Sequence, residues 1–138
     1  MLSLEEIKKA VVKACSNFDC IYAILFGSRA ISNAKEYSDI DIAVKFKDSS
    51  NSLNKALNIM SIIEEELNTH VDVVPLNIAD TIIKYEVYSQ GIILFNTNND
   101  IYMDDYINAI DEYLDFEYIF NKFYKIIVDE IKDASTRS

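Results

Sequence analysis

The sequence predicts an α/β (α+β) domain in which helices flank a four-stranded sheet and a helical extension follows at the C-terminus. Short apolar or alternating segments typical of strands occur at 21–26, 39–46, 70–76 and 92–95. Segments with the apolar spacing of amphipathic helices separate these strands, and a long helical pattern covers 101–132. Strands that alternate with helices of these lengths predict one sheet with helices packed against it.

The first helix and the first strand each carry a local signal. Ser3 and Glu6 match a capping box, and apolar residues then recur at helical spacing, which predicts a helix over 3–18. The apolar run IYAILF at 21–26 is short and rich in Ile and aromatic residues, so it predicts a buried strand. We expect residues 27–38 to be irregular or partly helical.

The second and third strands both contain acidic residues. The segment DIDIAVKF at 39–46 alternates with period two, which places Asp39 and Asp41 on one face of a strand. Leucine, isoleucine and alanine then recur over 53–67 at the spacing of a helix of about four or five turns. HVDVVPL at 70–76 predicts a strand that ends near the single proline, which strand ends tolerate.

The C-terminal part of the chain predicts one more strand between two helices. A helix is expected from about 78 to 89, with Gly91 at its C-cap position, and IILF at 92–95 predicts the fourth strand. The polar residues 96–100 then lead into a helical segment at 101–132. The last few residues are expected to fray.

Length and composition predict a single globular unit. The chain has 138 residues, of which 50% are hydrophobic, enough for an ordinary core. We expect a main domain at 1–96 and a C-terminal helical extension at 97–138 that belongs to the same unit. No apolar stretch is long enough to span a membrane and no signal-peptide pattern is present, so we expect a cytoplasmic protein without membrane contact. Cys15 and Cys20 are expected to be reduced.

The charge of the chain limits its partners. A formal net charge of −10 argues against direct contact with nucleic acid, because Lys and Arg that neutralise phosphates dominate that affinity. A basic protein partner or a metal–nucleotide complex fits the charge better. The alternative is that the acidic surface serves solubility alone.

The chain has only two glycines, and the first of them opens a candidate phosphate-binding loop. Gly27 follows the first strand and allows the backbone to approach a ligand closely. The hydroxyl of Ser28 can bond a phosphate oxygen, and the guanidinium of Arg29 can neutralise its charge or form an exposed salt bridge. The loop by itself is a weak signal.

Three aspartates in predicted strands indicate a metal site. Asp39 and Asp41 project from one face of a strand about 6–7 Å apart, close enough to share one or two divalent cations. A solvated strand start is the alternative for this pair. Asp72, placed between two valines of another strand, strengthens the metal interpretation because three carboxylates converge if the strands are neighbours. Carboxylate and phosphate oxygens favour Mg²⁺, and such a site suits phosphoryl or nucleotidyl transfer.

At this point the sequence resembles a known family. Gly27-Ser28, ten intervening residues and Asp39-Ile40-Asp41, followed by Asp72, resemble the G-S-x10-D-x-D pattern of the polymerase-beta-like nucleotidyltransferase superfamily. The stretch LFGSRA…SDIDIAV is most similar to the minimal nucleotidyltransferases (MNT), including MntA-type antitoxins of HEPN/MNT toxin–antitoxin systems. The resemblance covers roughly residues 21–95 and implies a mixed four-stranded nucleotidyltransferase sheet.

The resemblance also implies roles for these residues. Asp39 and Asp41 would bind two Mg²⁺ ions, Asp72 would bind the catalytic one and help to activate the nucleophile, and Gly27 with Ser28 would hold the triphosphate of ATP. The implied activity is transfer of AMP to a protein hydroxyl, a tyrosine of a HEPN ribonuclease toxin, in a hetero-oligomer. The alternatives are a catalytically silent antitoxin that acts by binding, and a small-molecule nucleotidyltransferase of the antibiotic type.

Three further features bear on that hypothesis. Such proteins often carry Arg-Gly where this chain has Ile31-Ser32, so activity needs a direct test. His70 could share a strand face with Asp72, although a surface or supporting role is the commoner one for a lone histidine. The segment 101–132 is unusually aromatic, which favours a partner surface over a helix whose second half bends back onto the domain.

Overall fold

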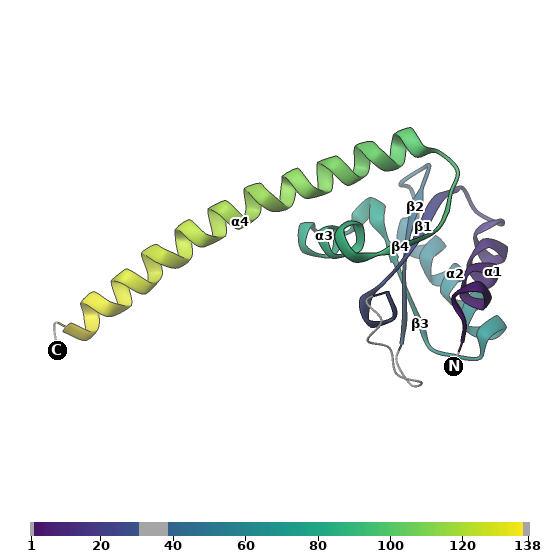
Figure 1. Cartoon of the computed structure of the whole chain (residues 1–138), viewed down its shortest axis with the longest axis horizontal. Coiled ribbons are helices and arrows are strands. Elements are labelled where there is room, and N and C mark those ends of the chain that lie inside the picture. The colour runs from purple at the N-terminus through teal and green to yellow at the C-terminus, as the bar shows by residue number, and fades with distance from the viewer. Residues whose placement is uncertain (1, 31–38, 137–138) are drawn as a thin grey trace.

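The computed structural model describes residues 2–30 and 39–136 and contains one mixed four-stranded sheet with helices on both faces (Figure 1). Its strands lie in the order β3-β2-β1-β4. The fold class predicted from the sequence is therefore confirmed. The elements are α1 (Leu4–Cys15), β1 (Cys20–Phe26), the 3₁₀ turn η1 (Gly27–Arg29), β2 (Ile40–Phe46), α2 (Ser52–Leu67), β3 (Val71–Pro75), the 3₁₀ turn η2 (Leu76–Ile78), α3 (Thr81–Gln90), β4 (Ile92–Asn96) and α4 (Asn99–Thr136).

The directions of the strands decide which residues share an edge of the sheet. β1 pairs antiparallel with both β2 and β4, whereas β2 and β3 are parallel and are joined by the crossover helix α2. The C-terminal end of β1 and the N-terminal ends of β2 and β3 consequently lie at the same edge. The loop after β1 and the acidic residues of β2 and β3 meet there.

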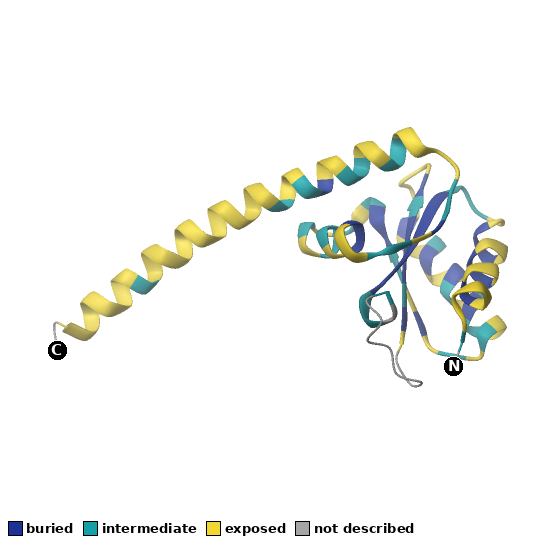
Figure 2. Cartoon of the chain, viewed as in Figure 1, coloured by how far each residue is buried: buried dark blue, intermediate teal, exposed yellow. Residues whose placement is uncertain are grey.

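Two apolar layers enclose the sheet (Figure 2). α1 and α2 cover one face, where Val11, Ile59 and Ile63 pack against Ile42 and its neighbours. α3 and the first part of α4 cover the other face through Val87, Tyr88 and Ala109. β1 is buried along nearly its whole length because both layers pack against it, which explains its continuous apolar sequence.

Local capping signals set the ends of the shorter helices. The Ser3 hydroxyl caps α1 by accepting a hydrogen bond from the Glu6 amide at 3.1 Å, as the predicted capping box requires. The Glu6 carboxylate accepts from the Ser3 hydroxyl at 3.2 Å rather than from the Ser3 amide. α3 begins later than predicted because Asp80 caps it, accepting from the Ile83 amide at 2.8 Å. Gly91 occupies the C-cap of α3 as expected, with extended rather than left-handed backbone.

The helix α4 is continuous over 38 residues and projects from the body of the molecule (Figure 1). Its first turns pack on α3 and the sheet, whereas nearly all residues from Asp115 onward are exposed (Figure 2). The second half does not bend back onto the domain. Within the described ranges, no helix is both long and apolar enough to cross a membrane.

Candidate active site

The candidate site is built at the shared edge of β1, β2 and β3. In the sheet register Asp41 pairs with Phe26, the last residue of β1, and on its other side with Asp72 of β3. Asp39 comes directly before β2, and Gly27 directly follows β1. The sheet therefore brings together the two acidic strands and the glycine loop, as the sequence predicted from separate segments.

Gly27 is required for two separate reasons. Its φ of +77° lies in the left-handed region that side chains other than glycine rarely adopt. A Cβ atom built on it would collide with Oδ2 of Asp41, so only glycine allows the carboxylate to approach the loop backbone. The turn that follows is closed by the Ala30 amide, which donates to the Gly27 carbonyl at 3.1 Å.

The remaining loop residues are described to different extents. Ser28 is partly buried in the turn η1, at the edge of the sheet where the three aspartates lie. The backbone of Arg29 ends this turn, but its side chain lies outside the described part of the structure. Ile31-Ser32, where the sequence departs from the family pattern, also lies outside the described residues.

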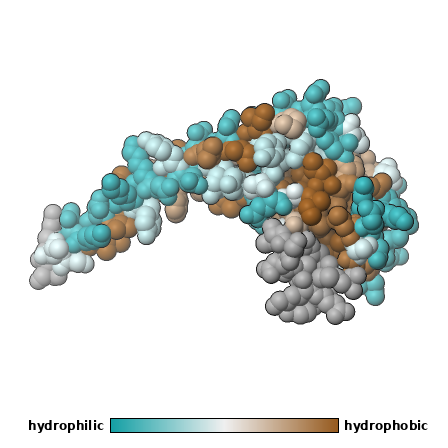
Figure 3. All heavy atoms as spheres, in the orientation of Figure 1, coloured by the Kyte–Doolittle hydropathy of each residue, from teal (hydrophilic) through white to brown (hydrophobic). Residues whose placement is uncertain are grey.

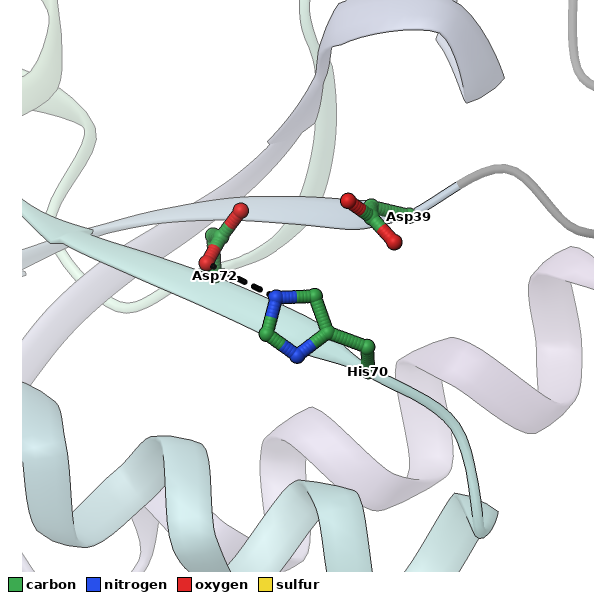
Figure 4. Close-up of side chains that lie close together, drawn as sticks. All are labelled: Asp39, His70 and Asp72. Carbon is green, nitrogen blue, oxygen red and sulfur yellow. Dashed lines mark ion pairs between the residues drawn. The ribbon is translucent and has the colours of Figure 1, made fainter.

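The carboxylates of Asp39 and Asp72 converge on the imidazole of His70 (Figure 4). One ligand atom from each of these three residues lies within 4.8 Å of the others, and all three residues are exposed. Asp41, which is partly buried, lies beside this group and faces Gly27. The strand pairing thus gives two neighbouring groups of possible metal ligands. One contains Asp39, His70 and Asp72, and the other is Asp41 beside the glycine loop.

The electrostatics of the site are unfavourable in the absence of a cation. Burial raises the pKa of Asp41, and the nearby charges of Asp72, Asp39 and Glu86 raise this pKa further, while His70 opposes the shift. Acids placed this close to one another repel, and a divalent cation with oxygen ligands removes the repulsion. The donor set, with two exposed carboxylates and a third partly buried, fits such an ion.

Two site neighbours were not predicted from the sequence. Glu64 of α2 lies 4.0 Å from Nδ1 of His70, and Glu86 of α3 acts on Asp41. Glu64 begins the acidic run 64–66 of α2, and Glu86 is the single acidic residue of α3. Their positions depend on how α2 and α3 pack against the sheet, which no local pattern encodes.

Comparison with known proteins identifies the family. The family model described as "Polymerase beta, Nucleotidyltransferase" matches residues 5–100, which include the whole sheet and the three aspartates. The chain belongs to this family. As a nucleotidyltransferase, it carries its acidic strands and glycine turn inside the matched region, whereas almost all of α4 lies beyond it.

Individual relatives of this nucleotidyltransferase agree with the family assignment. A candidate protein adenylyltransferase of Methanocaldococcus jannaschii is 30% identical over 91 residues, which cover 66% of this chain and 97% of the relative. A chain from a toxin–antitoxin complex crystallised with AMP-PNP has 25% identity and a TM-score of 0.69, covering 90% of this chain and 98% of its own.

A further solved structure shares the fold along nearly the whole chain. It contains a tri-AMPylated Shewanella oneidensis HEPN toxin in complex with its MNT antitoxin. The match has 21% identity and a TM-score of 0.72, with 91% of this chain and 99% of the other covered. Because both matches cover 90% or more of this chain, α4 belongs to the architecture that it shares with these structures.

Proposed function

We propose that this nucleotidyltransferase transfers AMP from ATP–Mg²⁺ to a hydroxyl of a partner protein, a tyrosine of a HEPN-type ribonuclease toxin, and thereby neutralises it. The observation that carries the proposal is the convergence of Asp39, Asp41 and Asp72 beside Gly27 at one edge of the sheet. Support comes from the methanogen relative named for protein adenylylation and from the AMPylated toxin bound to a structural neighbour.

The proposed roles follow from position and chemistry. Asp39 and Asp41 bind the metal ions from the β2 side, Asp72 binds from β3, and Ser28 with the Gly27 backbone holds the triphosphate. Bound Mg²⁺ neutralises the phosphate charge and stabilises the charge that develops on the leaving group. Arg29 is proposed to pair with a phosphate oxygen from the same turn.

The transfer is a single displacement at the α-phosphorus of ATP. A bond forms between the acceptor hydroxyl oxygen and the α-phosphorus, while the bond from this phosphorus to the oxygen bridging to the β-phosphate breaks. Pyrophosphate leaves with the electron pair of that bond. Asp72, whose side chain is 52% exposed, is the proposed acceptor of the hydroxyl proton because it is open to an incoming partner.

The projecting part of α4 is the proposed docking surface for the toxin. Apolar side chains recur there at three- or four-residue steps from Tyr113 to Ile131. Tyr113 is partly buried and stacks on Tyr85 of α3, whereas the others are exposed (Figure 3). Such a stripe fits an amphipathic helix of a partner. Its members are Tyr113, Phe116, Phe120, Phe123, Ile127 and Ile131.

The charge of α4 specifies the character of that partner helix. The helix carries ten acidic side chains and three lysines, so it holds seven of the ten net negative charges of the chain. Glu117 and Glu130 flank the apolar stripe. Two copies of α4 would repel along these flanks, whereas a helix with basic flanks would be attracted. The proposed partner is therefore a helical protein with basic residues beside its apolar face.

Labelled ATP provides the direct test of AMP transfer. The chain is incubated with α-labelled ATP, Mg²⁺ and a HEPN-type protein, the product of the neighbouring gene being the first candidate, and transfer of label to this protein is followed. Asp39→Asn and Asp41→Asn should reduce transfer about a thousandfold or more, because several kcal/mol of charge stabilisation are lost. Asp48→Asn is the matched control, since Asp48 lies beyond the opposite end of β2.

The outcomes separate the proposed activity from its alternatives. No transfer by the wild-type chain, or equal transfer by Asp39→Asn, would overturn the proposal. If the aspartate variants still neutralised the toxin, a silent antitoxin acting by binding would be favoured. Label on small hydroxylated molecules and none on the toxin would favour the antibiotic type.

The docking surface is tested by exchanging one exposed aromatic residue. Phe120→Asp places a charge in the apolar stripe and should weaken toxin binding by at least about tenfold, since central aromatic residues dominate interfaces. Tyr118→Asp is the matched control, because Tyr118 is 70% exposed but lies on the opposite face of the helix. Equal effects of the two variants would contradict docking through this stripe.

A further inference from the structure

His70 occupies a position in the site that the family motif does not explain. Its Nε2 atom lies 3.4 Å from Oδ1 of Asp72, and a ligand atom of Asp39 lies within 4.8 Å of both side chains. Figure 4 shows the ring directed toward Asp72 and the space between the two carboxylates. An ion held by Asp39 and Asp72 would therefore have an imidazole nitrogen within its reach.

The second nitrogen of the ring faces another carboxylate. Nδ1 of His70 lies 4.0 Å from Oε1 of Glu64, which belongs to α2 on the other side of the imidazole. Histidines that bind metals commonly direct their other ring N–H at a carboxylate, which fixes the tautomer and the ring orientation. The distance of 4.0 Å is longer than a hydrogen bond, and Glu64 is the carboxylate toward which Nδ1–H would donate after a small movement of either side chain, leaving the lone pair of Nε2 for a metal ion.

A purely structural role explains His70 less well. Its side chain is 58% exposed, and ion pairs on such surfaces contribute about 0–1 kcal/mol to stability. The ring nevertheless lies between two acidic groups from different elements, at the edge where the acidic strands meet. Nε2 therefore lies beside carboxylates that could share an ion with it, and Nδ1 is directed at Glu64.

We propose that His70 is a nitrogen ligand of the metal ion held by Asp39 and Asp72, so that this position favours a divalent transition-metal ion over Mg²⁺. The proposal rests on the proposed function, because it concerns the same site. Mg²⁺ prefers oxygen ligands only, whereas imidazole binds transition metals better. The neighbouring position at Asp41 and the glycine turn offers oxygen ligands and remains suited to Mg²⁺ with the nucleotide.

Mn²⁺ is the probe for this proposal because its pulsed EPR spectrum reports a bound nitrogen directly. His70 is the single histidine of the chain, so a protein without an affinity tag has one imidazole that can give the signal. The chain is loaded with less than one equivalent of Mn²⁺, with and without AMP-PNP. Labelling histidine with ¹⁵N distinguishes its coupling from that of the adenine nitrogens. We expect a nitrogen coupling that changes with the label.

Variants then measure the contribution of each group. His70→Gln should abolish the coupling and lower the affinity for Mn²⁺ relative to Mg²⁺ roughly tenfold. Glu64→Gln should retain the coupling and lower the Mn²⁺ affinity by a smaller factor. Glu65→Gln, an exposed neighbour on α2 with the same change of charge, is the matched control and should have no effect.

The results distinguish this inference from the proposed function. Absence of histidine coupling in the wild-type protein, with and without AMP-PNP, would overturn His70 as a ligand even if AMP transfer with Mg²⁺ proceeds. An unchanged Mn²⁺ to Mg²⁺ preference in His70→Gln would do the same. Absence of AMP transfer alongside a clear histidine coupling would instead overturn the proposed activity and leave the ligand assignment standing.

Discussion

Two carboxylate clusters at the sheet differ in how their charges are balanced. In the interior cluster, Asp105 of α4 lies 3.3 Å from the Lys45 ammonium and accepts a hydrogen bond from the Tyr22 hydroxyl at 2.8 Å. In the site cluster, Asp39, Asp41 and Asp72 face one another. In the first cluster, protein groups neutralise the carboxylate and donate a hydrogen bond to it. In the second cluster, carboxylates lie near one another, and a bound cation would neutralise their charge.

The interior cluster attaches α4 to the sheet. Because the carboxylate of Asp105 can only accept, Tyr22 donates to it, and Tyr88 of α3 in turn donates to the Tyr22 oxygen. Burial is the main cause that raises the pKa of both tyrosines, so both keep their protons. β1, α3 and α4 are thereby joined by one chain of hydrogen bonds. The comparison teaches that an acid neutralised by a lysine and a tyrosine fixes the architecture, while acids that repel one another mark the candidate site.

After the loss of transfer expected from the aspartate variants above, the largest expected effect comes from breaking the site cluster at its glycine. Gly27→Ala forces a left-handed alanine and pushes the Asp41 carboxylate away. We expect AMP transfer to fall about a hundredfold, because small displacements of catalytic groups have effects of that size. The free energy of unfolding should fall by about 1–3 kcal/mol. Transfer assays and urea unfolding provide the measurements.

Gly91→Ala is the matched comparison for that variant. An alanine Cβ there would collide with the Ile24 side chain and the Val87 carbonyl, and with none of the site carboxylates. This variant should lose stability while the folded fraction keeps its transfer activity. Wild-type activity in Gly27→Ala would contradict the close approach of Asp41 to the loop.

A smaller effect, on stability, is expected from the interior cluster. Asp105→Asn keeps the shape but removes the charge that pairs with Lys45, and should lower the free energy of unfolding by about 2 kcal/mol. Asp104→Asn is the control, since Asp104 is exposed and should change stability by less than about 0.5 kcal/mol. Equal thermal melts for the two variants would show that the Asp105 contacts add nothing to stability.

The smallest expected effect is an increase in stability, and it sharpens the contrast between the two clusters. Asp41→Asn removes repulsion among the site acids and should raise the free energy of unfolding, measured with a chelator, by up to about 1 kcal/mol. The pKa of Asp41 is raised in the folded protein, so its carboxylate destabilises the fold at neutral pH. The stability advantage of Asp41→Asn over the wild-type protein should shrink as the pH falls from this raised pKa toward the pKa of the same carboxyl in the unfolded chain. A less stable variant at pH 7 would contradict the repulsion.

Much of the fold was predictable because its signals are local. Alternation at 39–46, the apolar run at 21–26 and the capping box at Ser3 each depend on neighbours in the sequence. Element ends shifted where a specific contact intervened, as at Asp80, which delays the start of α3. The candidate metal residues were also predictable, since carboxylates inside apolar strands have few structural uses.

Other parts of the site depend on packing between distant segments. Glu64 and Glu86 reach the site from two helices, and the sequence does not show which acidic residues of these helices face it. Gly91 was predictable as a helix end, but the reason for glycine there is the close approach of Ile24. Helical spacing in α4 predicted a helix without giving its direction relative to the sheet.

The sequence by itself determined the elements of this nucleotidyltransferase and its three aspartates, because periodicity and residue chemistry act over short distances. The tertiary structure decided that β2 and β3 run parallel, which brings Asp41 beside Asp72. It also placed His70 between Glu64 and Asp72 and left the end of α4 exposed. These relations arise from the packing of whole elements, where contacts between residues far apart in the chain outweigh local preference.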